Sequence, residues 1–134
     1  MPPVSDQLNS ERLARRWFAT VEQGAFDRLV ELVHDDIRLV SRVRAGVTVE
    51  GRSDVTRFIR ETVAGSLYEA TAELYVPLDE NRVIVEGRMR WIDEQRVIRD
   101  DPVVWALEFE DELLIRFAPA RTIVEAETIL TAPR

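Results

Sequence analysis

The sequence predicts an α+β fold, in which three N-terminal helices pack on a curved, mostly antiparallel sheet and a short helix follows the sheet. Two observations predict this class. Apolar residues recur mainly at helical spacing up to residue 65, whereas from Tyr68 onward they alternate with polar residues, as in strands with one buried face. The helical patterns therefore precede most of the strand patterns instead of alternating with them, and that order is typical of α+β proteins.

The composition is that of a globular protein of one domain. With 134 residues, 46% apolar and 32% charged, we expect a single domain over residues 1–134, of which 1–9 form a flexible lead-in. No apolar run approaches the roughly 20 residues of a membrane span, and the N-terminus lacks the layout of a signal peptide, so we expect a cytoplasmic protein without a membrane partner. The absence of cysteine agrees with that compartment and excludes thiolate metal sites. The net charge of -7 disfavours nucleic acid as a partner.

The first helix is predicted to run up to Gly24. Its apolar face consists of Leu13, Trp17, Phe18 and Val21. Gly24 follows the last apolar position, where glycine easily adopts the left-handed backbone conformation that ends a helix. At the other end Ser10, Asn9 or Ser5 would serve as the N-cap, because short polar side chains accept hydrogen bonds from the free amides of the first turn.

A second, shorter helix and a strand are expected next. The apolar pattern from Phe26 to Val33 is helical, and it places His34 at the end of this helix. The acidic residues 35–36 oppose the helix dipole, so the helix should stop there. Residues 37–43 are then expected to form a strand. The segment 45–51, which contains a glycine near each end, is either a loop or a short strand.

A third helix is expected to open at Ser53 and Asp54 and to end at Gly65. Its apolar face consists of Val55, Phe58, Ile59 and Val63. A fourth, short helix is predicted over residues 123–130. It would begin after Thr122, because a threonine followed by glutamate three residues later is the pattern of a capping box.

Four strands are expected between the last two helices, at residues 68–76, 82–91, 96–110 and 113–118. The residues expected to face the core are Ala70, Ala72, Leu74, Val76, Val83, Val85, Gly87, Met89, Trp91, Val103, Trp105, Leu107 and Phe109. The apolar rows of the expected strands 82–91 and 96–110 share a face if residue 91 pairs with residue 97. In that register Arg99 and Asp101 face the core beside Met89. A bulge at residues 100–102 would turn both to the surface, and we favour the bulge.

With these elements the sequence resembles the NTF2-like superfamily of cone-shaped α+β proteins, and within it the SnoaL-like group, from about Leu13 to Leu130. The residues that carry the resemblance are Trp17-Phe18 to Gly24, Phe26-Asp27, residues 32–36, Gly51 leading to Val55 and Phe58, residues 85–88, the hairpin from Trp105 to Arg116, and residues 123–126. The resemblance implies a conical pocket between helices and sheet, and homodimers formed through the sheet. The superfamily contains ketosteroid isomerases, polyketide cyclases, epoxide hydrolases and scytalone-type dehydratases as well as binding and assembly modules, so it implies a fold and not a function.

The resemblance also indicates which side chains would line that pocket: Trp17, Phe18, Ser41, Phe58, Met89, Trp91 and Trp105. A ligand pocket and an ordinary packed core explain these side chains equally well, because the pocket wall and the core face are one surface in this fold. Ser41 has no neighbouring base that would activate it, so it would act as a hydrogen-bond donor and not as a nucleophile.

The groups that catalyse reactions in these families are missing. Counted along the sequence, the tyrosine donor, the general-base aspartate and the protonated aspartate of the ketosteroid isomerases correspond to Trp17, Ser41 and Trp105. Isomerase chemistry needs a carboxylate base and donors that point at the developing enolate, so we do not expect that mechanism. Around Arg116 the last strand lacks the carboxylate of the epoxide hydrolases, and one histidine, His34, cannot form a dehydratase site. A structural or solvated role is expected for His34.

The expected function is therefore the binding of a small apolar or aromatic molecule, with unassigned chemistry and without a metal or a cofactor. One alternative is a cyclase or isomerase for a polyketide- or steroid-like substrate, in which Asp101 is the base and Arg99 orients the substrate. A second alternative is a non-catalytic homodimeric interaction module that uses the outer face of the sheet. The charged residues expected on that face are Glu86, Arg88, Arg90 and Glu108.

Overall fold

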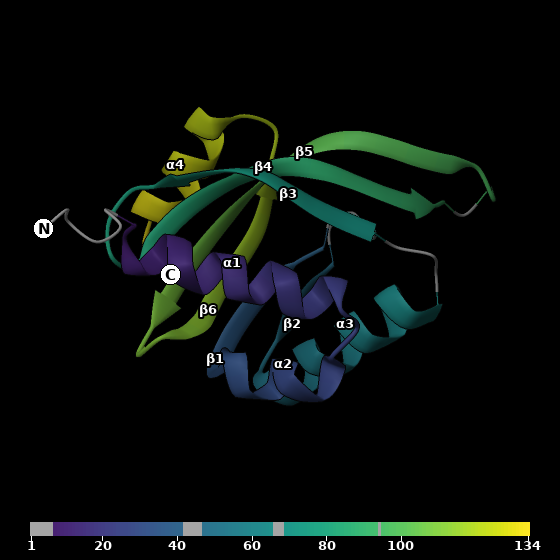
Figure 1. The fold of residues 1–134 in the computed structure, drawn as a ribbon, viewed down its shortest axis with the longest axis horizontal. Coiled ribbons are helices and arrows are strands. Elements are labelled where there is room, and N and C mark those ends of the chain that lie inside the picture. Colours follow the sequence, from purple (N-terminus) through teal and green to yellow (C-terminus); the bar gives the residue numbers. More distant parts are fainter. Residues whose placement is uncertain (1–6, 42–46, 66–68, 94) are drawn as a thin grey trace, which may run out of the picture.

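The chain follows the predicted order of three helices, a sheet and a closing helix, which confirms the α+β class (Figure 1). The computed structural model describes residues 7–41, 47–65, 69–93 and 95–134, without the side chains of 63–65. The helices are α1 (Asn9–Glu22), α2 (Phe26–Leu32), α3 (Arg52–Gly65) and α4 (Ile123–Thr131). The strands are β1 (Val33–Val40), β2 (Thr48–Glu50), β3 (Glu69–Pro77), β4 (Arg82–Ile92), β5 (Ile98–Glu110) and β6 (Leu113–Ala120).

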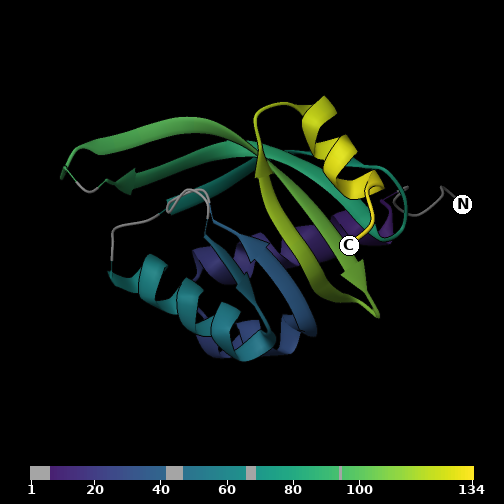
Figure 2. The same ribbon diagram turned by 180° about the vertical axis from the view of Figure 1, so that it is seen from behind.

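One six-stranded sheet joins these strands in the order β2-β1-β6-β5-β4-β3. Strands β1 and β6 pair in parallel, and the other neighbouring pairs are antiparallel. The sheet is curved, with α1, α2 and α3 on its inner side and α4 on its outer side, against β4, β5 and β6 (Figure 1, Figure 2). The main hydrophobic core fills the inner side, and a smaller one lies beneath α4. No helix in the described ranges is long and apolar enough to cross a membrane.

Helix α1 packs on the sheet through the face that its periodicity predicts. Leu13, Trp17 and Phe18 are buried in the main core. Gly24 follows the helix with a φ of 69°, which is the conformation expected for a glycine that ends a helix. The predictions for residues 1–6, 42–46, 66–68 and 94, and for the side chain of residue 63, fall outside the described part of the chain. Asn9, which we expected in the lead-in, already belongs to α1.

The N-cap predicted for α1 is wrong. Leu8 occupies the cap position, and its side chain makes no capping hydrogen bond. The free end of the helix is bound by the β3–β4 turn instead. The amide of Asn9 donates to the Glu80 carboxylate at 2.9 Å, and the Ser10 hydroxyl donates to the carbonyl of Asp79 at 2.6 Å. A contact between segments far apart in the sequence therefore replaces the local cap.

Helix α2 is shorter than predicted, because the chain enters the sheet earlier. The helix ends at Leu32, and both Val33 and His34 belong to β1, so the placement of His34 at a helix end is wrong. Val33 pairs with Leu114 of β6 and is completely buried. A β-branched residue with a partner strand is more favourable in the sheet than in a helix of two turns, so tertiary pairing overrides the local periodicity. Strand β2 shows that the segment 45–51 contains a short strand.

The alternation of β3 reverses at an irregularity in its pairing with β4. Between Ala72 and Leu74 the partner in β4 advances by only one residue, so one extra residue is inserted in β3. Leu74 is consequently 50% exposed, and Tyr75 packs against the main core instead. The prediction that Leu74 and Val76 continue the inner row is wrong, because the insertion shifts the period of two by one position.

Strands β4 and β5 pair in a register that differs from the predicted one, but their side chains point to the predicted faces of the sheet. Trp91 pairs with Arg99 and not with residue 97, a shift of two residues, which leaves the parity of every side chain unchanged. The inner rows of the two strands therefore share one face, as predicted. Met89 pairs with Asp101, and no irregularity interrupts the described pairs of these strands. The favoured bulge at residues 100–102 is wrong.

The chain between β5 and the C-terminal end follows its local signals. Asp111 and Glu112 form a two-residue turn in which both have positive φ, 52° and 66°, as tight hairpins of this kind require. Thr122 is the N-cap of α4, and its hydroxyl accepts a hydrogen bond from the amide of Glu125 at 3.1 Å. The predicted N-cap at Thr122 and the closing helix are confirmed.

Candidate functional site

An apolar cavity lies between the inner side of the sheet and the helices α1 and α3. Its described lining residues are Trp17, Phe18, Val21, Leu39, Val40, Ser41, Phe58, Ile59, Thr62, Ala70, Met89, Trp105, Phe117 and Pro119. Half of these residues are buried and half keep partial exposure to solvent. The cavity is therefore a cleft that reaches toward the surface, with walls from segments far apart in the sequence.

Aromatic rings take up much of the space on the inner side. The ring of Phe18 lies 4.9 Å from that of Trp105, and the ring of Phe117 lies 6.1 Å from that of Trp17. The space that remains for the centres of water-sized molecules is about 60 Å³. Pockets for drug-sized ligands measure roughly 300–1,000 Å³. As it stands, the cavity is several times smaller than such pockets, so only a small molecule would fit without movement of the wall.

The cavity wall carries no charge. None of the described lining residues has an ionisable side chain. Among the lining residues, Ser41 and Thr62 carry a hydroxyl and Trp17 and Trp105 carry an indole N–H. General acid–base catalysis needs a titratable group within hydrogen-bond reach of the substrate. The described lining supplies none, but it can enclose an apolar molecule, exclude water and donate hydrogen bonds.

Most of the side chains predicted for a pocket lie at this cavity. Those that border it are Trp17, Phe18, Ser41, Phe58, Met89 and Trp105. Trp91 is half-buried at the margin of the main core and is not in the described lining. The sequence reasoning missed Leu39 and Phe117, which pair with each other across β1 and β6. That contact joins parallel strands far apart in the sequence, and no turn or local pattern indicates it.

The two residues considered for catalysis lie outside the cavity lining. Asp101 shares the inner face with its partner Met89, but it does not border the described cavity. Arg99 donates to Asp93 at 2.9 Å, within the hairpin that joins β4 and β5. The pKa of Asp93 lies below its ordinary value, mainly because the carboxylate accepts the amide of Val97, with a further contribution from Arg99. Arg99 therefore already has a carboxylate partner in the turn.

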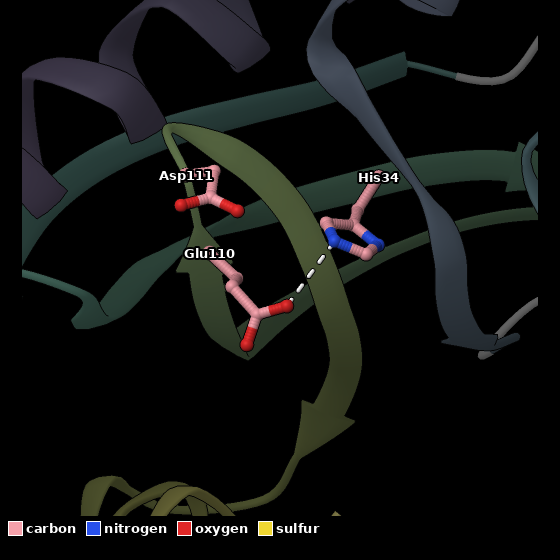
Figure 3. A group of neighbouring side chains, drawn as sticks. All are labelled: His34, Glu110 and Asp111. Atoms are coloured by element: carbon pink, nitrogen blue, oxygen red, sulfur yellow. Dashed lines mark ion pairs between the residues drawn. The ribbon is translucent and has the colours of Figure 1, made fainter.

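A cluster around His34 contains residue types that bind metals, and its hydrogen bonds favour a structural role. Nε2 of His34 lies 3.1 Å from Oε2 of Glu110, and Asp111 offers a further carboxylate within 4.8 Å (Figure 3). Nδ1 accepts the amide of Asp36 at 3.0 Å, so the neutral ring carries its proton on Nε2. A metal at Nε2 would displace that proton to Nδ1 and break the bond to Asp36. The cluster instead links β1 to the turn between β5 and β6.

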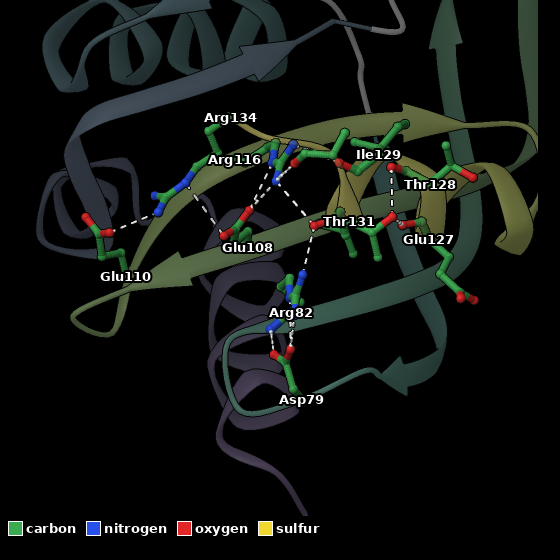
Figure 4. Close-up of polar contacts among 12 residues, drawn as sticks. Asp79, Arg82, Glu108, Glu110, Arg116, Glu127, Thr128, Ile129, Thr131 and Arg134 are labelled. Atoms are coloured by element: carbon green, nitrogen blue, oxygen red, sulfur yellow. Dashed lines mark hydrogen bonds and ion pairs between the residues drawn. The ribbon is translucent and has the colours of Figure 1, made fainter.

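A second polar network, on the outer side of the sheet, holds the end of α4. Arg116 is 9% exposed. It donates to Glu108 at 3.0 Å, to the carbonyl of Ile129 at 2.7 Å and to that of Ala132 at 3.1 Å (Figure 4). Arg82 donates a further bond, of 3.0 Å, to a carbonyl in the last turn of α4. Guanidinium groups thus satisfy the free carbonyls of the helix end and complement its dipole.

Asp79 fixes Arg82 in this network. Its carboxylate accepts Nε of Arg82 at 2.8 Å and the amide of Asn81 at 2.9 Å. Burial acts to raise the pKa of Asp79, but the hydrogen bonds from Arg82 and from the backbone outweigh it and lower the pKa below its ordinary value. Glu108, which we expected on this face, forms a cross-strand ion pair with Arg116 of β6, and the pair supports the end of α4.

The fold and the cavity define an α+β cone with an apolar interior. A sequence model of the SnoaL-like domain matches residues 14–117. The chain belongs to the SnoaL-like domain family. A comparison with curated proteins found no match.

Solved structures share the fold at low sequence identity. The RV0760c protein of Mycobacterium tuberculosis, in complex with estradiol-17beta-hemisuccinate, is 12% identical, with a TM-score of 0.73 over 89% of this chain and 98% of that one. The Delta 5-3-ketosteroid isomerase of a Mycobacterium species is 13% identical, with a TM-score of 0.71 over 89% and 97%. A putative polyketide cyclase of Xanthomonas campestris is 14% identical, with a TM-score of 0.71 over 88% and 96%. These likenesses establish the NTF2-like fold.

Proposed function

We propose that this protein binds a small apolar or aromatic molecule in the inner cavity and performs no acid–base chemistry there. One observation carries the proposal: the described lining encloses residual space with aromatic and aliphatic side chains and contains no ionisable group. The complex of RV0760c with estradiol-17beta-hemisuccinate supports it, because a protein of similar fold holds an organic ligand. The proposal treats residues 1–134 as one functional unit.

The cyclase or isomerase alternative has less support. It requires Asp101 as a base at a bound substrate, with Arg99 beside it. Asp101 does not border the described cavity, and Arg99 is held by Asp93. The binding proposal therefore expects Asp101→Asn to leave ligand affinity unchanged, and this variant serves as a control.

The test is a titration with methylenecyclohexane, an uncharged molecule of one ring, followed by the amide spectrum of the labelled protein. We expect saturable binding with a millimolar or lower dissociation constant and shifts at the cavity residues. Ala70→Leu adds three carbon atoms at a half-buried lining position, so it should weaken binding at least about tenfold by filling the cavity.

Two controls separate filling of the cavity from other effects. Thr71→Leu adds an apolar side chain at the neighbouring, exposed position of β3, and Asp101→Asn removes the candidate base. Both should bind methylenecyclohexane as the unaltered protein does. Absence of saturable binding, or equal affinity of Ala70→Leu and Thr71→Leu, would contradict the proposal.

The working unit that we propose is a cytoplasmic homodimer formed through the outer face of the sheet. On that side helix α4 packs against β4, β5 and β6, and the hairpin of β4 and β5 extends past it (Figure 2). Large apolar side chains are exposed at Leu74, Val97 and Ile98, by 50%, 49% and 60%. Such residues are favourable in a contact between subunits. Light scattering at high concentration should give twice the mass of one chain, and a monomer there would exclude this part of the proposal. The lack of cysteine in the sequence agrees with a reducing compartment.

A further inference from the structure

A carboxylate lies next to the cavity on the inner face of the sheet. Ala70, Met89 and Asp101 form one row across β3, β4 and β5, because Ala70 pairs with Met89 and Met89 pairs with Asp101. The first two of these residues line the cavity. Neighbouring members of such a row are about 4.8 Å apart and point to the same face. Asp101 is therefore the next side chain of this row beyond the cavity wall.

The Asp101 carboxylate has no cation beside it. It is half-buried, and within the described ranges of the chain it makes neither a hydrogen bond nor an ion pair. Arg99, on the same face, donates to Asp93 in the turn at 2.9 Å, and Arg88, on the opposite face, donates to Asp100 at 3.1 Å. A partly desolvated carboxylate is more favourable with an opposite charge nearby. Asp101 is therefore available to a cation that does not belong to the described chain.

An aromatic ring accompanies this carboxylate. Trp91 is the next inner-face residue of β4 after Met89, and it pairs with Arg99, so it lies diagonal to Asp101 on one face. Diagonal neighbours are about 7–8 Å apart, within reach of aromatic side chains. Trp91 lies beyond Arg90, the last residue of β4 that pairs with β3, and it keeps partial exposure. Part of its ring is therefore accessible to a ligand at the cavity.

The two groups together select a class of ligand. A carboxylate attracts a cation by charge, and the face of an indole ring attracts it through its quadrupole. An anion would be repelled by Asp101, and an uncharged polar group would gain neither interaction. Alkylamines carry a proton at neutral pH, as the lysine side chain does. An ammonium group next to an apolar body therefore matches Asp101, Trp91 and the uncharged cavity beside them.

We infer that the inner face of the β4–β5 hairpin contains an amine subsite, formed by Asp101 and Trp91, which binds the ammonium group of a ligand whose apolar ring occupies the cavity. The inference rests on the proposed function and adds a charged group to the ligand outside the uncharged lining. It gives Asp101 the role of a binding residue and not of a base. The part of the ligand inside the cavity remains apolar, and a wholly uncharged ligand does not use the subsite.

The test compares 2-cyclohexylethylamine with 2-cyclohexylethanol, in which a hydroxyl group replaces the ammonium group, at pH 7. Asp101→Asn removes the charge with little change in shape. It should weaken binding of the amine about fivefold and keep the affinity for the alcohol within about twofold. Trp91→Leu removes the ring face, so it should reduce the affinity for the amine about threefold more than that for the alcohol.

The matched control is Asp100→Asn, which removes the same charge from the adjacent residue on the outer face. It should keep the affinity for the amine within about twofold. Equal effects of Asp100→Asn and Asp101→Asn on the amine, an equal loss for amine and alcohol in Asp101→Asn, or absence of amine binding would overturn the inference. Binding of the alcohol or of methylenecyclohexane would then leave the proposed function intact, and failure of all three ligands to bind would overturn the proposed function as well.

Discussion

Gly87→Ala should lower the free energy of unfolding by about 3 kcal/mol or more, or prevent folding. A Cβ atom at residue 87 would lie 2.0 Å from the carbonyl oxygen of Thr71 and 3.0 Å from Cζ3 of Trp105. The first of these atoms belongs to the backbone of the neighbouring strand, next to the inserted residue of β3, so it cannot rotate away. Relief requires β3 to separate from β4 or Trp105 to leave its position in the core. Urea unfolding of the variant measures the effect.

The matched control is Gly24→Ala. At this position the nearest atom to a new Cβ is a ring carbon of Phe26, at an ordinary 3.9 Å, and the penalty comes from the φ of 69°. A left-handed conformation of alanine costs about 1–2 kcal/mol. Gly24→Ala should therefore be distinctly milder than Gly87→Ala. Equal effects of the two substitutions would mean that the close approach of β3 to β4 is not as described.

Arg116→Met should destabilise the protein by about 3 kcal/mol, because it leaves the Glu108 carboxylate and the free carbonyls of α4 without their main donor. The side chains of Arg116 and Glu108 are only 11% and 14% exposed, so water cannot fully replace the lost bonds. The residual contact of Glu108 with Arg134, at 3.7 Å, is long. Chemical denaturation of the single variant measures the loss.

Two further variants show whether the loss of the buried ion pair causes the destabilisation of Arg116→Met. The double substitution of Arg116 and Glu108 to methionine removes both charges, so it should be more stable than the single Arg116→Met variant. Arg12→Met breaks an exposed pair with Glu112, whose partners are 48% and 61% exposed, and it should change stability by less than about 1 kcal/mol. A double variant as unstable as the sum of the single ones would contradict the pairing argument.

The fold was predictable where local signals and burial agree. The face of α1 that carries Trp17, the alternation of β4 and the cap at Thr122 each follow from spacing and side-chain chemistry, and the structure confirms them. The errors occur where a distant partner decides. Val33 enters the sheet because β6 pairs with it, and β3 inserts one residue where it passes Gly87. A glycine inside a strand is a general signal for such a close approach, although it does not specify the partner.

The candidate site was predictable in its composition but not in its size. A shared inner face follows from the parity of the strands, so Met89 and Trp105 could be placed in one wall without knowledge of the register. The volume that remains depends on how the rings of Phe18, Trp105 and Phe117 pack, and a sequence does not specify side-chain packing.

The central claim is that the cavity binds an uncharged apolar ligand through a wall without ionisable groups. Its most direct test is the dissociation constant of methylenecyclohexane, measured between about pH 5 and pH 8, where histidine and perturbed carboxylic acids titrate. Neither the ligand nor the described lining changes charge in this range, so the constant should stay within about twofold. Absence of saturable binding, or a dissociation constant that changes about tenfold across this range, would contradict the account.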